Sequence, residues 1–149
     1  MDTPRPLLSV RGLQTYFSAD EGTVKAVDGV SFDVYPGQTL GIVGESGCGK
    51  SVTAHSILRI VEEPGRIVGG QIVLRREAGE LDLVTLSANG RAMRSIRSGV
   101  IGYVFQEPMS AFSPVHTIGN QIREAIQFHR RVSKREAHDR GIQLLRRWN

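Results

Sequence analysis

The sequence predicts an α/β fold in which an antiparallel, β-rich part comes first and a helical part comes last. Three observations support this fold class. Short stretches rich in β-branched residues, separated by turn residues, fill the chain up to Tyr35. An apolar stretch without alternation, Thr39–Val43, then runs directly into a glycine-rich loop and a helix-like segment. From Thr117 onward, apolar residues recur at helical spacing.

The N-terminal part is expected to form an antiparallel meander. Its expected strands are Leu7–Thr15, Val24–Val27 and Val30–Val34. Ser-Ala-Asp-Glu-Gly and Asp-Gly, which favour turns, separate them. In the third strand Val30, Phe32 and Val34 alternate with polar residues, which predicts one half-buried apolar face.

The middle of the chain predicts alternating strands and helices. Tyr35-Pro36-Gly37 is expected to turn the chain into Thr39–Val43, a parallel strand buried on both faces. A helix is expected at Ser51–Val61, where apolar residues are helically spaced before Glu62-Glu63-Pro64-Gly65. Further expected elements are the strands Gly70–Leu74, Leu81–Leu86 and Gly99–Phe105, the last ending at Gln106, and the short helix Asn89–Arg97.

Two helices are expected at the end of the chain. Thr117–Arg130 carries an apolar stripe formed by Ile118, Ile122, Ala125 and Ile126. Ser133, followed three residues later by Glu136, has the pattern of a capping box that opens the last helix. The apolar positions of this helix are Ala137, Gly141, Leu144, Leu145 and Trp148.

Composition indicates a globular domain in a reducing compartment. Of the 149 residues, 40% are hydrophobic and 23% are charged, which allows a buried core. No apolar run approaches the ~20 residues of a membrane-spanning helix, and the N-terminus does not resemble a secretory leader. The single cysteine, Cys48, has no Cys or His neighbours at zinc spacing. We therefore expect a cytosolic protein without structural metal.

The net charge of +4 is concentrated near the C-terminus. Residues 120–149 contain eight Arg or Lys and three Asp or Glu. Charge runs usually mark solvated helix faces, and the segment lacks the interleaved aromatics that single-strand stacking requires. We therefore expect solvent-exposed helices rather than a nucleic-acid site.

The glycine-rich loop Gly44–Ser51 satisfies the pattern G-x-x-x-x-G-K-[ST]. Gly44, Gly47 and Gly49 are expected to reach positive φ, so that consecutive N–H groups form a nest for a phosphate. Lys50 is expected to contact the β- and γ-phosphates, and Ser51 to offer its hydroxyl to Mg²⁺. The positive end of the following helix favours the same anion.

A chance match is the alternative for this loop, but the preceding apolar strand and the following helix are the surroundings that the motif requires. Cys48 lies inside the loop. Its side chain is expected to point away from phosphate and to pack. The alternative is that its thiol makes nucleotide binding sensitive to alkylation or oxidation.

Three stretches of the chain resemble the ATP-binding subunits of ABC transporters, and among them the oligopeptide and dipeptide importers. Val24–Thr53 is similar to the approach to their Walker A loop, and Gly102–Ile122 is similar to their Q-loop segment. The spacing of Leu13–Phe17 puts Phe17 at the position of the family's adenine-stacking aromatic. The resemblance covers essentially the whole chain.

The resemblance implies a nucleotide-binding core at 1–115, with an antiparallel β-subdomain, and the start of a helical subdomain at 116–149. It implies that Phe17 stacks on adenine; ordinary packing of Tyr16 and Phe17 at a strand end is the alternative. It also implies that Lys50 and Gln106 take part in catalysis and that Ser51 and Gln106 bind Mg²⁺. The residues expected to bind ATP are Phe17, Gly44, Glu45, Ser46, Gly47, Cys48, Gly49, Lys50, Ser51 and Val52.

The segment after Gln106, Glu107–Ile122, is expected to face a membrane partner. Here Ala111–Pro114 replaces the Leu-Asn-Pro type of run that relatives commonly carry. The implied partners are transmembrane permease subunits and a second ATPase subunit. The implied location is the cytoplasmic face of the cell membrane.

The family's LSGGQ signature, its second acidic motif with the catalytic Glu and its switch His do not occur in the 149 residues. We therefore expect a fragment of a chain about twice as long, because the family's sheet needs further strands and an exposed apolar edge aggregates. The fragment is expected to bind ATP and to hydrolyse it poorly. The alternatives are a nucleotide-binding module that does not cycle and a DNA-associated ATPase. Peptides, nickel and sugars all stay open as the transported solute.

Overall fold

The computed structural model describes residues 5–106 and 112–147. The chain divides into two compact units, Met1–Ile96 and Arg97–Asn149. The expected division of the sequence into 1–115 and 116–149 stays a prediction.

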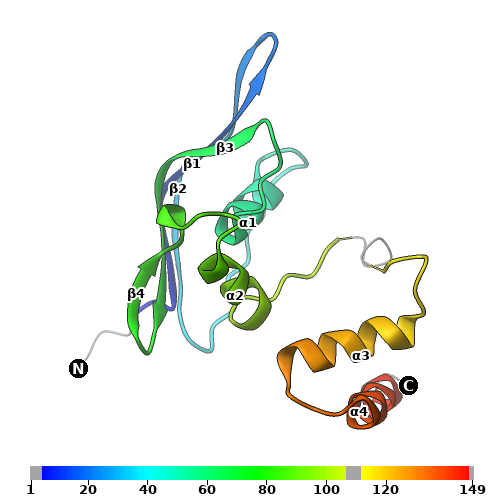
Figure 1. Ribbon diagram of the computed structural model, residues 1–149. Coiled ribbons are helices and arrows are strands. Elements are labelled where there is room, and N and C mark those ends of the chain that lie inside the picture. The colour runs from blue at the N-terminus through cyan, green and yellow to red at the C-terminus, as the bar shows by residue number, and fades with distance from the viewer. Residues whose placement is uncertain (1–4, 107–111, 148–149) are drawn as a thin grey trace. The chain divides into compact units, whose positions relative to one another are not determined.

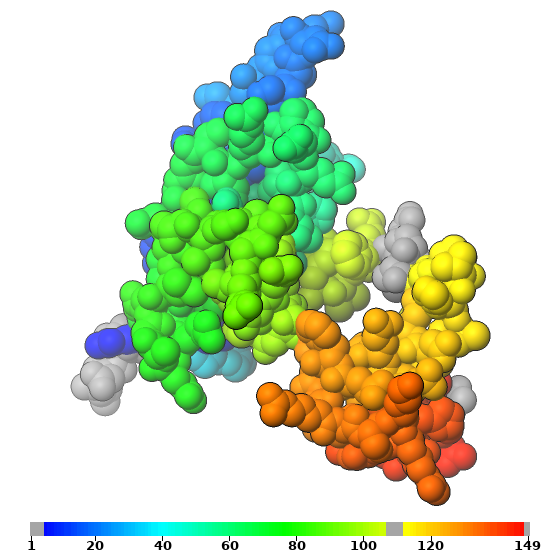
Figure 2. Space-filling model, viewed as in Figure 1, coloured from blue at the N-terminus to red at the C-terminus, as the bar shows by residue number. Residues whose placement is uncertain are grey.

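The first unit is built on a four-stranded antiparallel sheet with the strand order β2-β1-β3-β4. Its strands are β1 (Leu8–Ala19), β2 (Gly22–Val34), β3 (Gly65–Arg76) and β4 (Gly79–Asp82). The tip of the β1–β2 hairpin projects beyond the rest of the sheet (Figure 1), and in the space-filling view it stands clear of the other side chains of this unit (Figure 2). The predicted antiparallel start of the chain is confirmed.

The two short strands expected at Val24–Val27 and Val30–Val34 are one continuous strand, β2. Asp28-Gly29 predicted a turn, but here it forms a β-bulge. Leu13 of β1 pairs with Val30 and the next residue, Gln14, pairs with Asp28, so that Gly29 is left over with φ 85°. A glycine at positive φ lets the strand bend and continue.

The helices α1 (Lys50–Leu58) and α2 (Arg91–Gly99) confirm the two helices expected in the middle of the chain, with shifted bounds. Figure 1 shows α1 and the start of α2 on the same side of the sheet. The strand expected at Leu81–Leu86 ends early, at Asp82. The Asp82 carboxylate accepts a hydrogen bond from Val84 N at 3.0 Å and so caps a 3-10 turn, Leu83–Thr85.

The core of the first unit combines side chains of the sheet with side chains of α1, α2 and the 3-10 turn. Its buried apolar side chains are Val10, Leu13, Val27, Leu58, Ile72, Leu74, Leu83, Met93 and Ile96. Phe32 and Val34 are half-buried as expected, whereas Val30, expected on the same face, is 37% exposed. The buried face of α1 also differs from the expected apolar stripe, since Thr53 and Ser56 are buried beside Leu58.

Two predicted strands are wrong: the parallel strand Thr39–Val43 and the buried strand Gly99–Phe105. Neither segment has strand structure, and Gly99 is the last residue of α2. Val43 is 93% exposed and Val104 is 87% exposed. A parallel strand forms only when neighbouring strands take up its N–H and C=O groups, and the described residues supply no such neighbour to either segment.

The second unit contains two packed helices, α3 (Ile118–His129) and α4 (Lys134–Arg146), as predicted (Figure 1). Thr117 caps α3 and Ser133 caps α4 through hydrogen bonds from Asn120 N and Glu136 N. A Cβ on buried Gly141 would lie 3.3 Å from Ile122 Cγ2, so the helices approach closely there.

The expected apolar stripes of α3 and α4 are only partly buried. Ala137 and Gly141 are buried, whereas Ile118, Leu144 and Leu145 are 48 to 56% exposed. Trp148 lies outside the described residues. Among residues 5–106 and 112–147, no helix combines the length and the apolar character needed to cross a membrane.

Candidate functional site

The glycine-rich loop leads directly into the first turn of α1. Gly47 and Gly49 have φ values of 83° and 91°. Gly49 is the N-cap residue, makes no side-chain capping bond and is followed by a first turn without acidic residues. The amides that open α1 therefore face no carboxylate of their own turn, which leaves the positive end of the helix able to bind an anion.

Steric room explains two of the three glycines. A Cβ on Gly49 would collide with the carbonyl oxygen of Ala26. Gly44 does not adopt the positive φ expected from the sequence. A glycine fits at this position because a Cβ there would lie 2.5 Å from Cys48 Sγ.

The Lys50 side chain is turned back over the loop. Its ammonium donates to the carbonyl oxygens of Gly44 and Glu45, both at 2.7 Å, and lies 3.4 Å from Cys48 Sγ. The ammonium thus contacts carbonyl oxygens of the loop. The contact with phosphate that the sequence predicted for Lys50 stays a prediction.

Cys48 does not pack as expected. Its side chain is exposed, and its sulfur lies 3.4 Å from the Lys50 ammonium, in space left by the missing side chain of Gly44. Its expected orientation away from phosphate stays a prediction.

The other loop residues lie around the start of α1. Glu45, Ser46 and Ser51 are exposed, and Val52 is half-buried. The carbonyl oxygen of Gly49 accepts both the amide and the hydroxyl of Thr53, at 2.8 and 2.9 Å. These two bonds fix the first turn of the helix.

A buried hydroxyl pair that the sequence analysis missed connects α1 to β1. Ser56 Oγ donates to Val52 O at 2.7 Å, and Thr15 Oγ1 lies 2.8 Å from Ser56 Oγ. Because Ser56 has only one hydroxyl hydrogen, Thr15 is the donor between the two. A Thr in an alternating strand and a Ser in a helix give no sequence pattern that would pair them.

Phe17 follows two residues after Thr15 on β1, so the same strand carries both the contact to α1 and the predicted adenine-stacking ring. Phe17 is half-buried and pairs with Val24 on β2 and Gly65 on β3. Thr15 hydrogen-bonds this strand to Ser56 of α1, so Phe17 lies on the strand that is bonded to the helix beginning at Lys50.

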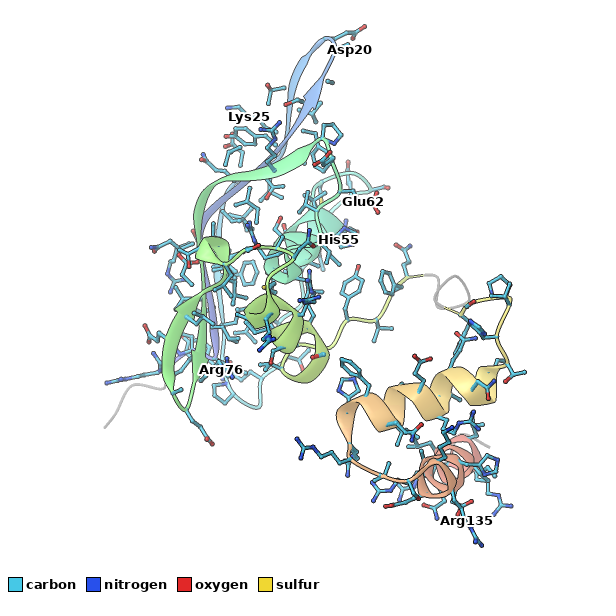
Figure 3. All side chains as sticks on the ribbon, viewed as in Figure 1. Asp20, Lys25, His55, Glu62, Arg76 and Arg135 are labelled. Atoms are coloured by element: carbon cyan, nitrogen blue, oxygen red, sulfur yellow. The ribbon has the colours of Figure 1, made fainter. Side chains whose placement is uncertain are left out.

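A polar cluster surrounds Asp28 on the exposed hairpin, where Figure 3 labels Lys25. The Asp28 carboxylate accepts hydrogen bonds from Tyr16 Oη at 2.6 Å, Gln14 Nε2 at 3.2 Å and Lys25 Nζ at 3.5 Å. The Tyr16 hydroxyl is the main cause that lowers the pKa of Asp28, and the same bond raises the pKa of Tyr16. The cluster ties the side chain of Tyr16 on β1, the neighbour of Phe17, to Asp28 on β2.

A hollow of ≈ 410 Å³ lies beside the loop. Lys50 and Cys48 line it together with apolar side chains such as Phe32, Leu40 and Ile42. A larger hollow of ≈ 580 Å³ lies between α3 and α4 in the second unit and contains none of the predicted site residues. We locate the candidate site by the loop, because the loop carries the groups that can hold an anion.

Gln106 is exposed and belongs to the second unit. It does not follow a buried strand as expected, since Gly99–Phe105 is not a strand. Its predicted roles in catalysis and in Mg²⁺ binding stay predictions. Of the segment expected to face a membrane partner, residues 107–111 lie outside the described part of the chain.

Residues 27–147 match the family model described as ABC transporter. The chain belongs to this family. This result confirms the family resemblance found in the sequence.

Two curated relatives are named as ATP-binding proteins of a peptide ABC transporter or of peptide import. The chain is 48% identical over 141 residues to the probable peptide ABC transporter ATP-binding protein y4tR of Sinorhizobium fredii, covering 94% of the chain and 40% of the relative. It is 45% identical over 145 residues to the putative peptide import ATP-binding protein BMEII0863 of Brucella melitensis, covering 96% of the chain and 42% of the relative. The chain thus spans about two fifths of the length of these relatives.

Solved structures show the same fold. The ATP-binding cassette MJ0796, in a dimeric post-hydrolysis state bound to ADP and Pi, superposes with a TM-score of 0.77 at 20% identity. The match covers 93% of the chain and 56% of the solved cassette. A second dimeric structure of the same cassette gives the same score and coverage. The predicted fold, the core of an ABC ATPase with an antiparallel β-subdomain, is confirmed at this level.

Proposed function

We propose that this chain is the ATP-binding part of an importer ATPase of the ABC transporter family. The observation that carries the proposal is the Lys50 ammonium, held over a loop with two positive-φ glycines at the uncapped start of α1. Ammonium, loop amides and helix end together supply what a triphosphate needs.

Each site residue has a distinct role in this proposal. Lys50 exchanges its bonds to the Gly44 and Glu45 carbonyl oxygens for the β- and γ-phosphate oxygens. The backbone from Gly44 to Val52 surrounds the phosphates, and Phe17 stacks on adenine. Ser51 and Gln106 hold Mg²⁺, which neutralises phosphate charge when it is bound.

The biological setting is also part of the proposal. The relatives are named as peptide transporter or peptide import ATP-binding proteins, so we propose uptake of peptides or similar solutes. Separate permease subunits would carry the solute, and a second ATPase subunit would complete the assembly at the cytoplasmic face of the membrane. The dimeric cassettes with the same fold support such a pairing.

The test of ATP binding is the Lys50→Ala variant of the chain. A hydrogen bond from a charged donor contributes about 1.5–3 kcal/mol, so we expect the affinity for Mg-ATP to fall by a factor on the order of 10 to 100. Isothermal titration calorimetry measures both affinities. Lys134→Ala, which removes an exposed lysine from α4, is the matched control and should keep the affinity of the unchanged chain.

Two outcomes would contradict the proposal: no heat when Mg-ATP is added to the unchanged chain, or equal affinities for the unchanged chain and Lys50→Ala. We also propose that the chain alone hydrolyses ATP poorly, because a positioned general base contributes about 10²–10⁴-fold to such reactions. A phosphate-release assay on the same sample measures this turnover. Rapid hydrolysis would refute the poor-hydrolysis part while leaving the binding site in place.

A further inference from the structure

The start of β3 leaves no room for a side chain beneath the ring of Phe17. A Cβ on Gly65 would lie 2.5 Å from Phe17 Cε1 and 2.7 Å from Phe17 Cζ. The same Cβ would lie 2.7 Å from Val61 Cγ1, which follows the end of α1. Phe17 and Val61 therefore converge on buried Gly65.

Backbone conformation does not explain why a glycine stands here. Gly65 does not have a positive φ, in contrast to Gly70 on the same strand. Its amide donates to Glu62 O at 2.9 Å, a bond that any residue other than proline could make. Glu62 is labelled in Figure 3, where the chain leaves α1 and turns toward β3. What Gly65 provides is space for the edge of an aromatic ring.

We propose that Gly65, together with Val61, is a positioning residue that sets the ring of Phe17 for stacking on the nucleotide base. The inference rests on the proposed function, in which Phe17 stacks on adenine. Cε1 and Cζ face Gly65, while the half-buried ring keeps part of its surface accessible. Phe17 also pairs with Gly65 across the β1–β3 ladder, so the ring and its support lie at one register position.

A methyl group at Gly65 would displace the ring without touching the phosphate loop. Carbon atoms in contact are about 3.5–4.0 Å apart, so the ring would have to move by about 1 Å or more. Stacking depends on such distances, whereas the bonds of Lys50 to phosphate do not involve Phe17. The expected effect is therefore confined to the base of the nucleotide.

The experiment compares Mg-ATP with magnesium tripolyphosphate, which lacks base and ribose, by calorimetry on the chain. Gly65→Ala should weaken ATP binding by about tenfold, within the range of losing one stacked base, and leave tripolyphosphate binding unchanged. Phe17→Ala should show the same selective loss. Val61→Ala adds no atoms and should weaken ATP binding in the same direction, which keeps the test valid if Gly65→Ala does not fold.

Gly69→Ala is the matched control on the same strand. Its Cβ would lie at the same distance, 2.5 Å, from an atom, but that atom is Gln14 Oε1 at the end of a flexible side chain. It should leave both affinities unchanged.

Several results would overturn the inference. If Phe17→Ala weakens ATP binding while Gly65→Ala and Val61→Ala do not, Gly65 and Val61 do not position the ring. Equal loss of ATP and tripolyphosphate affinity in Gly65→Ala would place the effect away from the base. If Phe17→Ala leaves ATP affinity unchanged, the stacking role of Phe17 falls and the inference falls with it. Absence of any ATP binding would instead refute the proposed function.

Discussion

The Asp33 carboxylate connects the two strands of the β1–β2 hairpin through charged hydrogen bonds. Ser9 Oγ donates to it at 2.6 Å, and Arg11 Nη2 donates to both of its oxygens at 2.7 and 2.8 Å. The Ser9 hydroxyl first, and then the Arg11 guanidinium, hold the pKa of Asp33 below its ordinary value. The charged form is therefore favoured in the folded chain.

A lowered pKa predicts the direction of a pH effect. Asp33 contributes stability above its ordinary pKa and loses that contribution as the pH falls through its lower folded-state pKa. We expect Asp33→Asn to unfold at lower denaturant than the unchanged chain at pH 7, with the difference vanishing at acid pH. Urea titrations across pH measure this. Asp20→Asn, at the tip of the same hairpin (Figure 3), removes an equal charge outside this cluster and should show no such trend.

At the scale of single residues, the sequence indicated which residues form the loop, but it predicted their backbone angles and side-chain contacts less well. Gly47 and Gly49 have the positive φ expected from the motif, whereas Gly44 does not. The position of Cys48 beside Lys50 depends on the space above Gly44, which no residue pattern contains. The bond between Thr15 and Ser56 joins residues 41 positions apart, and long-range pairs of this kind are invisible to local spacing.

The contact between α1 and β1 depends on that buried pair of hydroxyls. Ser56→Ala would leave the Thr15 hydroxyl without its acceptor at a position that is 0% exposed. The expected cost is about 1–3 kcal/mol in the free energy of unfolding. Thr15→Val together with Ser56→Ala removes both hydroxyls, and the double variant should lose less than the sum of the two single losses. Chemical denaturation of all four proteins measures the coupling, and strict additivity would contradict it.

The start of α4 depends on the cap at Ser133. Its hydroxyl accepts a hydrogen bond from Glu136 N at 3.2 Å, but the Glu136 carboxylate pairs with Arg140 at 2.8 Å, so the capping box is half formed. Ser133→Ala should destabilise the helix by about 1 kcal/mol, whereas Ser133→Asp, also a good N-cap, should retain its stability. Helicity followed by circular dichroism during heating is the measurement. Equal melting of both variants would show that the cap contributes little.

Helices were predicted more accurately than strands because their signals are local. The cap Ser133 lies where the sequence indicated, since capping depends on neighbours three residues away. Strand limits depend on partners. Gly29 and Gly70 have positive φ within long strands, where they form bulges instead of ending the strands as turns would.

Over the whole molecule, two apolar segments that were expected to be buried strands are exposed. Thr39–Val43 includes Leu40, Ile42 and Val43, which are 44, 50 and 93% exposed. Gly99–Phe105 includes Val104 at 87% and Phe105 at 49%. Their apolar composition predicted burial, but burial as strands also requires neighbouring strands. The chain spans about two fifths of its curated relatives, and its described residues do not supply those neighbours.

This exposure predicts that the chain associates with itself as its concentration rises. Contiguous apolar surface with unpaired backbone groups favours contacts between molecules. Val43→Lys and Val104→Lys each place a charge in one of the two segments, so we expect the double variant to stay monomeric at higher concentration. Sedimentation velocity over a concentration series measures this. Val68→Lys, at a 53% exposed position on β3, is the control and should associate as the unchanged chain does. If all three proteins sediment as monomers, the two segments do not drive association, and their apolar side chains are tolerated in water.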